Sequence, residues 1–508
     1  MLSSVLLLTG LYLYLSQQVC RPDLHWAGDW VDSLPILNMD DAYRYFLSRQ
    51  AWTQPALYLW NYVLPGNLLI DGLLGWATHY NLCGLRALHA LLGITGLYGL
   101  YRSMRLLEIA PGIALAALWL LGLMPLFVFV SVSFLGELLL FFCNSWLLVL
   151  HLQQQHRARA ACAAFLPFVR PDALLIIIPF VFLDLRQKNY KNLMITLTPG
   201  LLYFIFLLLH LRHPSDYWTW RILLRQHMSH FDFSPRYQFS QFLSNFSPFW
   251  VLPGLAGLWT LRLRRHVELW LGAVLSSAWF LLTVSLHASF YEDRYFVILL
   301  PALLLGWASL MHSLWTATWM QQTRKALTAT LIAYVLYLIA YHSLQLDPLR
   351  YQWAPEGRWP VAGVGPVATQ FLWVDQADLR AIRWQADFIT QAVHKIPGIT
   401  YLLINDTDVL YFLDPDQLPP SLHVGLTPVN AGMALHSLNG ELLTLFPQAP
   451  YYQYMTLFTP DPAVTTYALF VGNLECSVCR PLFHAGRHQV YITNYRLSDH
   501  SQFKEQMY

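Results

Sequence analysis

The sequence predicts an α-helical polytopic membrane protein with a small α/β domain after its last membrane helix. Of its 508 residues, 56% are hydrophobic and only 12% are charged, whereas soluble domains carry about 25% charged residues. Twenty Trp, 28 Tyr and 29 Phe residues fit the aromatic belts that membrane proteins place at both interfaces. The net charge of +2 is too small to indicate a nucleic-acid partner.

The membrane helices are predicted from apolar runs. A helix needs about 20 apolar residues to cross a bilayer, or fewer where it packs inside a bundle. Eleven runs are candidates, near residues 2–16, 84–101, 111–129, 134–151, 160–169, 173–185, 193–211, 249–261, 267–288, 295–312 and 326–344. The runs 160–169 and 173–185 are short, and they form either one broken helix or two short ones.

The positions of basic residues predict the topology. If every run crosses once, five basic loops fall on one side, which is then cytoplasmic. These loops contain Arg102 and Arg105, Arg157 and Arg159, Arg186 with Lys188 and Lys191, Arg262 with Arg264 and Arg265, and Arg324 with Lys325. If residues 160–185 formed one span, the basic loops would no longer all fall on the same side of the membrane. This argument favours two short helices. The N-terminus is then cytoplasmic, and its apolar run lacks the basic region and cleavage site of a signal peptide.

We expect two domains. Residues 1–345 form a transmembrane module whose first external loop covers 17–83. Residues 346–508 are Pro-rich and mixed-polar without a spanning run, and they form an extracytoplasmic α/β domain. Residues 375–393 have the apolar spacing of a helix, and Ile399–Ile404, 467–471 and 489–492 read as strands. We expect this domain to select or retain a substrate without supplying catalytic groups.

The first external loop contains an acidic pair, Asp40-Asp41, followed by Ala42 and Tyr43. Adjacent carboxylates can act as a general base or bind a divalent metal. A solvated turn that caps the next helix explains them equally simply. The pair alone leaves these alternatives open.

Four charged residues stand at the same predicted external face. Glu137 begins an apolar helix, either as a helix N-terminal charge or as part of a polar cavity. Arg170 and Asp172 lie between two short apolar runs, where they either pair with each other or offer the arginine to a phosphate. Arg294, before Tyr295, leads into another helix. Both arginines could be simple interfacial anchors.

Two cysteines near the C-terminus form a C-x-x-C motif. Cys476 and Cys479 are followed by His484 and His488, a spacing that could bind zinc. An oxidising external compartment favours a disulfide instead, and free thiols are the third alternative.

Together these motifs resemble the GT-C glycosyltransferases that use polyprenyl-phosphate sugars. The likeness is to the group of protein O-mannosyltransferases and bacterial aminoarabinose lipid A transferases, and it spans roughly residues 1–345 in matching order. The motifs that carry it are Asp40-Asp41-Ala42-Tyr43, Gln54-Pro55-Ala56-Leu57-Tyr58, Arg170-Pro171-Asp172-Ala173-Leu174-Leu175, and Arg294-Tyr295 with Pro301. The ordered set on one membrane face is specific, although no single motif is.

The resemblance implies an inverting glycosyltransferase of the inner membrane that transfers a sugar from a polyprenyl phosphate to an extracytoplasmic lipid, polysaccharide or protein. It assigns the base to Asp40, with Asp41 in the usually acidic second place. Arg170 and Arg294 are then candidates for the donor phosphate. The residues Tyr43, Gln54, Glu137, Asp172 and Tyr295 are the remaining candidate substrate contacts. Gln54 departs from the basic residue of the family, which puts its role at the phosphate in doubt. No cofactor is required, and a divalent metal is left open.

Two other classes compete with this interpretation. A transporter or flippase for a lipid-linked or anionic substrate would also be polytopic, but such proteins usually show internal repeats and polar residues at mid-membrane depth. A non-catalytic membrane scaffold would not need acidic and basic residues that converge from four loops.

Overall fold

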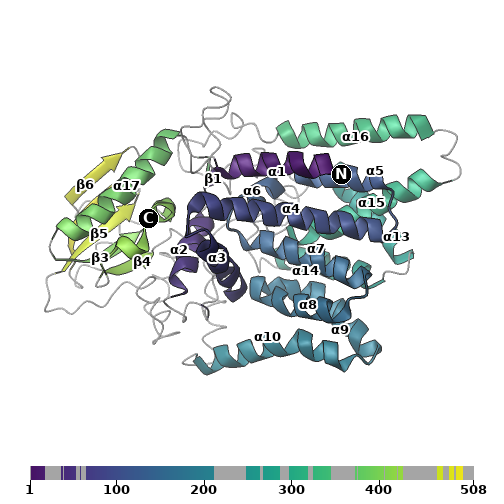
Figure 1. The fold of residues 1–508 in the computed structure, drawn as a ribbon, viewed down its shortest axis with the longest axis horizontal. Helices are drawn as coiled ribbons and strands as arrows, with labels where there is room; N and C mark the ends of the chain where they lie inside the picture. Colours follow the sequence, from purple (N-terminus) through teal and green to yellow (C-terminus); the bar gives the residue numbers. More distant parts are fainter. Residues whose placement is uncertain are drawn as a thin grey trace.

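The computed structural model combines a long helical bundle with an α/β unit at one end (Figure 1). The residues that it describes are 2–17, 36–37, 39–52, 58, 64–210, 248–263, 267–285, 297–317, 324–344, 372–373, 376–396, 398–404, 407–419, 422–426, 466–472, 480–485 and 488–495. Helices α2 and α3 lie between the bundle and the α/β unit.

Each of the eleven apolar runs contains at least one helix among its described residues. The bundle helices are α1 (Leu2–Gln17), α4 (Leu82–Leu106), α5 (Pro111–Gly122), α6 (Pro125–Ser131), α7 (Gly136–Leu152), α8 (His156–Val169), α9 (Leu174–Arg186), α10 (Tyr190–His210), α13 (Pro248–Leu263), α14 (Val267–Ser285), α15 (Leu300–Thr316) and α16 (Arg324–Leu344). The run 111–129 is two helices, because Pro125 begins α6 and removes a backbone donor. The runs 160–169 and 173–185 are separate helices, α8 and α9.

Two described helices are long and apolar enough to cross a membrane by themselves, Leu82–Leu106 and Val297–Thr316. Other described helices are apolar but shorter, among them Leu2–Gln17, Pro111–Gly122 and Gly136–Leu152. The structure thus contains a helix at each predicted position. Eleven crossings of a bilayer stay a prediction.

Polar side chains tie the helices of the bundle together at two opposite ends, with an apolar core between them. At one end, His151 of α7 contacts Glu268 of α14 at 2.9 Å, and Arg159 of α8 is ion-paired with Asp184 of α9. At the other end, Glu137 begins α7 and meets Arg170, which follows α8. Helices α7 and α8 are therefore antiparallel, and the basic loops 102–105, 157–159 and 186–191 belong to the end of His151.

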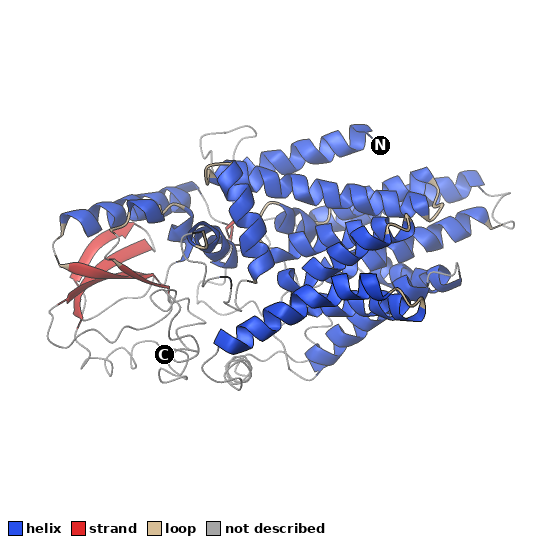
Figure 2. Cartoon of the chain, turned by 60° about the horizontal axis from the view of Figure 1, so that its bottom comes forward, coloured by secondary structure: helices blue, strands red, loops and turns tan. Residues whose placement is uncertain are grey.

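The C-terminal α/β unit, α17 with β3–β7, has one helix packed on a five-stranded sheet (Figure 2). Its elements are α17 (Gln376–Lys395), β3 (Ile399–Ile404), η8 (Thr407–Tyr411), η9 (Pro415–Gln417), β4 (His423–Leu426), β5 (Thr466–Gly472), β6 (Arg480–Ala485) and β7 (His488–Tyr495). The strand order is β4-β3-β5-β7-β6, with β3 parallel to β4 and β5, and β7 antiparallel to β5 and β6. The helix near 375–393 and the strands near 399–404, 467–471 and 489–492 are present. The domain boundary at residue 345 stays a prediction.

Two helices belong to the predicted first external loop. Helix α2 (Met39–Gln50) carries the acidic pair, and α3 (Pro65–Ala77) follows it. Leu69, Leu73 and Trp76 of α3 are exposed, as expected for a helix that lies against lipid. Before α2, β1 (Ile36–Leu37) pairs antiparallel with β2 (Leu372–Trp373), so the first loop is joined to the segment that precedes α17.

Candidate functional site

Asp41 of α2 is completely buried and bonded to three separate parts of the chain. Its Oδ2 accepts hydrogen bonds from Arg86 Nη2 of α4 at 2.6 Å and from the Tyr411 hydroxyl of η8 at 2.6 Å. Its Oδ1 accepts from the backbone N–H of Phe134, just before α7. Both carboxylate oxygens are therefore engaged, with no exposed surface left.

The surroundings of Asp41 favour a stable ion pair. The Arg86 guanidinium lies between two aromatic rings, 5.4 Å from the centroid of Phe134 and 5.2 Å from that of Tyr411, where cation–π attraction adds to the ion pair. Burial raises the pKa of Asp41 above its ordinary value, and the charge of Arg86 with the hydrogen bonds from Tyr411 and Phe134 offsets part of this rise.

Of the acidic pair, the structure describes the side chain of Asp41 alone. Asp41 is closed off from any substrate, so a base function for this side chain does not fit its surroundings. Asp40 is the second residue of α2. Its side chain, like that of Tyr43, lies outside the described part of the structure.

The structure brings together the side chains of Glu137, Arg170 and Asp172, and a role for them in binding a substrate stays a prediction. Arg170 donates from Nε and Nη2 to the two carboxylate oxygens of Asp172, at 3.0 and 2.9 Å, and its Nη1 donates to Glu137. Glu137 is nearly buried, whereas Arg170 and Asp172 keep 17% and 23% of their side-chain surface exposed. Of the alternatives for this arginine, the structure shows the pair with Asp172, and Glu137 belongs to the same polar cluster.

Arg44 and Asn67 lie against Gly136 beside this cluster, and the sequence predicts no role for either residue. A Cβ atom built on Gly136 would lie 2.6 Å from Arg44 Nη1 and 2.7 Å from Asn67 Nδ2, so both side chains approach the bare glycine closely. Asn67 Nδ2 donates to the Val169 carbonyl at 3.0 Å, next to Arg170. Within the described residues, Arg44 Nη1 and Asn67 Oδ1 are buried without a hydrogen-bond partner. The signal that could have found Arg44 is its spacing of four residues from Asp40.

A second buried pair lies beside Asp41. His89 Nε2 of α4 contacts Asp71 Oδ1 of α3 at 3.0 Å, and both side chains are almost fully buried. The His89 ring packs edge-on against Phe134, with 5.1 Å between ring centroids. Asp71 stands one helical turn after Asn67, so one face of α3 faces the polar junction while Leu69 and Leu73 face outward.

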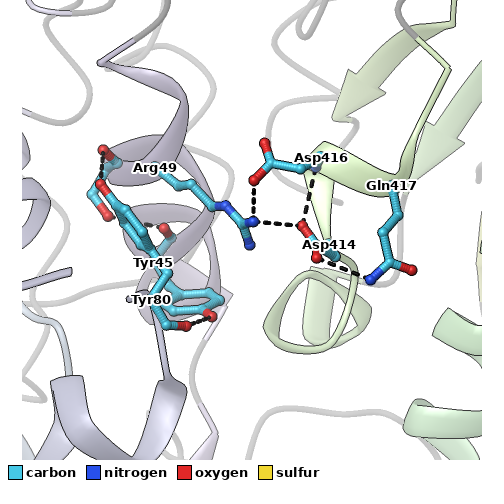
Figure 3. Close-up of polar contacts among 7 residues, drawn as sticks. Tyr45, Arg49, Tyr80, Asp414, Asp416 and Gln417 are labelled. Carbon is cyan, nitrogen blue, oxygen red and sulfur yellow. Dashed lines mark hydrogen bonds and ion pairs between the residues drawn. The ribbon is translucent and has the colours of Figure 1, made fainter. Parts of the chain in front are cut away.

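Helix α2 also reaches the C-terminal α/β unit through surface contacts (Figure 3). Arg49 forms ion pairs with Asp414, at 2.7 Å, and with Asp416. The Tyr45 hydroxyl donates to the Tyr80 carbonyl at 2.7 Å, which connects α2 to the turn before α4. Exposed ion pairs such as those of Arg49 contribute only about 0–1 kcal/mol each.

Several predicted site residues lie outside the described part of the structure, namely Gln54, Arg294, Tyr295, Cys476 and Cys479. The side chain of His488 is likewise not described, and His484 is exposed. Among the residues that the structure describes, no group of three or more His, Cys, Asp or Glu is arranged to hold a metal ion. The zinc and disulfide alternatives for the C-x-x-C motif therefore stay predictions. Cys83, at the start of α4, is disulfide-bonded.

Comparison by sequence identifies no relative, since neither a protein-family model nor a curated protein matches the chain. Among solved structures, the chain is similar to the crystal structure of ArnT from Cupriavidus metallidurans in the apo state. The TM-score is 0.50 at 14% sequence identity, and the alignment covers 96% of this chain and 97% of that one. At this identity the likeness concerns the fold. The chain therefore shares the overall fold of that structure.

Proposed function

We propose that the chain is an inverting glycosyltransferase that moves a sugar from a polyprenyl-phosphate carrier to an extracytoplasmic acceptor. The observation that carries the proposal is the buried Nη1 of Arg44, which stands over Gly136 without a hydrogen-bond partner among the described residues. The Arg44 side chain as a whole is half-buried, so it is this one N–H group that is withdrawn from water. An anionic oxygen is a strong acceptor for such a donor, and the phosphate of a lipid carrier supplies one.

The placement of the base rests on helix geometry. Asp40 and Arg44 are four residues apart on α2, and residues at this spacing share a helix face. Asp41 points into the junction with Arg86 and Tyr411. Helix α2 thus offers one acidic position and one guanidinium on the face next to Gly136, which supports Asp40 as the general base.

The proposed reaction is one displacement at the anomeric carbon. Asp40 takes the proton of an acceptor hydroxyl or amine as its oxygen or nitrogen forms a bond to that carbon. The bond from the carbon to the phosphate oxygen breaks, and the polyprenyl phosphate leaves with one more negative charge. Arg44 stabilises this charge, and Arg294 is the second proposed cation at the phosphate. Arg170 donates to Glu137 and Asp172, and it is a third proposed cation at the phosphate, because a guanidinium has five N–H donors.

We place the bundle in the inner membrane, with the junction facing away from the cytoplasm. The basic loops belong to the opposite end of the bundle, which fits the positive-inside rule. The disulfide-bonded Cys83 stands at the junction end, and disulfides persist in oxidising compartments. The lipid-facing character of α3 fits a site that a carrier lipid enters from the bilayer.

The test is turnover by the purified chain in lipid nanodiscs. A panel of polyprenyl-phosphate sugars is supplied with candidate acceptors, and the release of polyprenyl phosphate is followed together with the anomeric configuration of the product. Asp40→Asn should remove turnover by about 10²-fold or more, because the amide cannot accept the proton, and it should leave expression and folding intact. Asp416→Asn is the matched surface control. Movement of intact lipid-linked sugar across the bilayer without cleavage would identify a flippase instead.

A further inference from the structure

We propose that Tyr411 of the C-terminal α/β unit is a positioning residue for the catalytic loop, because its hydroxyl holds Asp41 and thereby fixes the first turn of α2. The proposal rests on the proposed function for its kinetic consequence. It differs from the expectation that this unit only selects a substrate, since it makes the unit part of the scaffold that orients the base.

The contact itself joins distant parts of the chain. Tyr411 stands 370 positions after Asp41, and its hydroxyl donates to Asp41 Oδ2 at 2.6 Å in a fully buried setting. The same oxygen accepts from Arg86 of α4 at 2.6 Å. One carboxylate therefore ties α2, α4 and η8 to one another. Because all three side chains are buried, the loss of one hydroxyl cannot be replaced by bulk water.

The apolar surroundings of α2 show the same association. Ala42, Phe46 and Leu47 of α2 are buried in one core cluster with Ile382 of α17 and Leu410 of η8. Helix α2 thus packs against the C-terminal α/β unit as part of its core. The antiparallel pairing of β1 with β2 adds a second connection, only two residues before α2 begins.

The consequence for catalysis follows from adjacency. Asp40 and Asp41 are consecutive residues of α2, so a rotation of the first turn that releases Asp41 also displaces residue 40. A displacement of about 1 Å at a reacting group can lower turnover by about 10²-fold. Tyr411 touches neither donor nor acceptor in this scheme and acts through Asp41.

The decisive variant is Tyr411→Phe in the full-length chain in nanodiscs. Phenylalanine keeps the ring over Arg86 and removes only the hydroxyl. We expect kcat to fall about tenfold, with the KM of the donor within about twofold of wild type, because the phosphate contacts are unchanged. Arg49→Gln, which removes the partly exposed ion pairs to Asp414 and Asp416 and the contact with the Tyr80 ring, should keep kcat within about twofold.

Two further measurements separate positioning from a general loss of stability. Amide hydrogen exchange should rise in residues 39–50 of Tyr411→Phe and stay unchanged in α13 and α15. In a double-mutant cycle, Asp41→Ala combined with Tyr411→Phe should be no slower than Asp41→Ala alone, because the alanine already lacks the oxygen that accepts from Tyr411.

Unchanged kcat in Tyr411→Phe, additive effects in the cycle, or increased exchange throughout the bundle would each overturn the proposal. The exchange measurement needs no substrate. If wild type cleaves no donor in the panel but exchange in α2 rises as expected, the proposed function fails while the positioning of α2 by Tyr411 is supported.

Discussion

Gly136→Ala is a sharp test of the site, because it adds one methyl group at the point where Arg44 and Asn67 converge. The new Cβ would lie 2.6 Å from Arg44 Nη1 and 2.7–2.8 Å from both amide atoms of Asn67, whereas ordinary contacts begin at 3.4 Å. Asn67 is held by its bond to the Val169 carbonyl. The flexible end of Arg44 must therefore move away to relieve the contact.

The expected result is a loss of activity that is larger than the loss of stability. A shift of this kind in a phosphate-binding guanidinium should lower kcat/KM for the donor by about 10²-fold, or roughly 2.7 kcal/mol. Gly136 is the first residue of α7, so alanine gains little helix propensity there, and the contact of the methyl group with the buried Asn67 costs some stability. The assay is polyprenyl phosphate release over a range of donor concentrations, together with thermal unfolding.

The matched control is Gly112→Ala, near the start of α5, where an added Cβ meets no atom within 4 Å. This variant should keep the kcat/KM of wild type. If Gly136→Ala also keeps it, Arg44 and the space over Gly136 are not part of the donor site, and the argument for the proposed function loses its main support.

Two further predictions concern buried charges. Arg159→Met leaves Asp184 buried without its ion-pair partner, which should destabilise the bundle by about 3–5 kcal/mol; thermal unfolding measures this loss, and Arg157→Met at an exposed position of the same helix should change it little. The pH profile of Tyr411→Phe should also shift. The Tyr411 hydroxyl, the Phe134 N–H, Arg86 and His89 all lower the pKa of Asp41 against the larger effect of burial, so removing the hydroxyl raises this pKa further. Asp41 then becomes protonated at higher pH. The fall of kcat on the acidic side of the profile should therefore begin at a higher pH in Tyr411→Phe than in wild type. Superimposable profiles would contradict the assigned role of the hydroxyl.

The helices of the bundle could be predicted from the sequence because a long apolar run has few structural solutions. An apolar segment in lipid must satisfy its backbone groups internally, so a helix is the default. Helix α3 could not be predicted in this way. Its Asn67 and Asp71 interrupt the apolar run, and only the structure shows that they face Val169 and His89.

The candidate site was predictable in part. Glu137, Arg170 and Asp172 were grouped because they lie at the same predicted membrane face, and the structure brings them together. The partners of Asp41 were not predictable. Arg86 lies near the start of α4, and no neighbouring residue in the sequence indicates its ion-pair partner. Tyr411 lies in a different part of the chain. Pairings of this kind depend on tertiary packing, which leaves no periodic pattern in the sequence.

The spacing of residues in α2 accounts for why the acidic pair contains two different carboxylates. Consecutive positions on a helix point about 100° apart, so the two side chains leave the helix in different directions. Asp41 faces the buried junction with Arg86 and Tyr411, and a charge placed there needs all of its partners to remain buried. The other position of the pair is four residues before Arg44, and its side chain is the proposed base. Through Asp41, helix α2 connects the first loop to the C-terminal α/β unit. Through Asp40, the same helix is proposed to present a base to the substrate. The second role depends on the first, because the bonds of Asp41 fix the rotation of α2 about its axis.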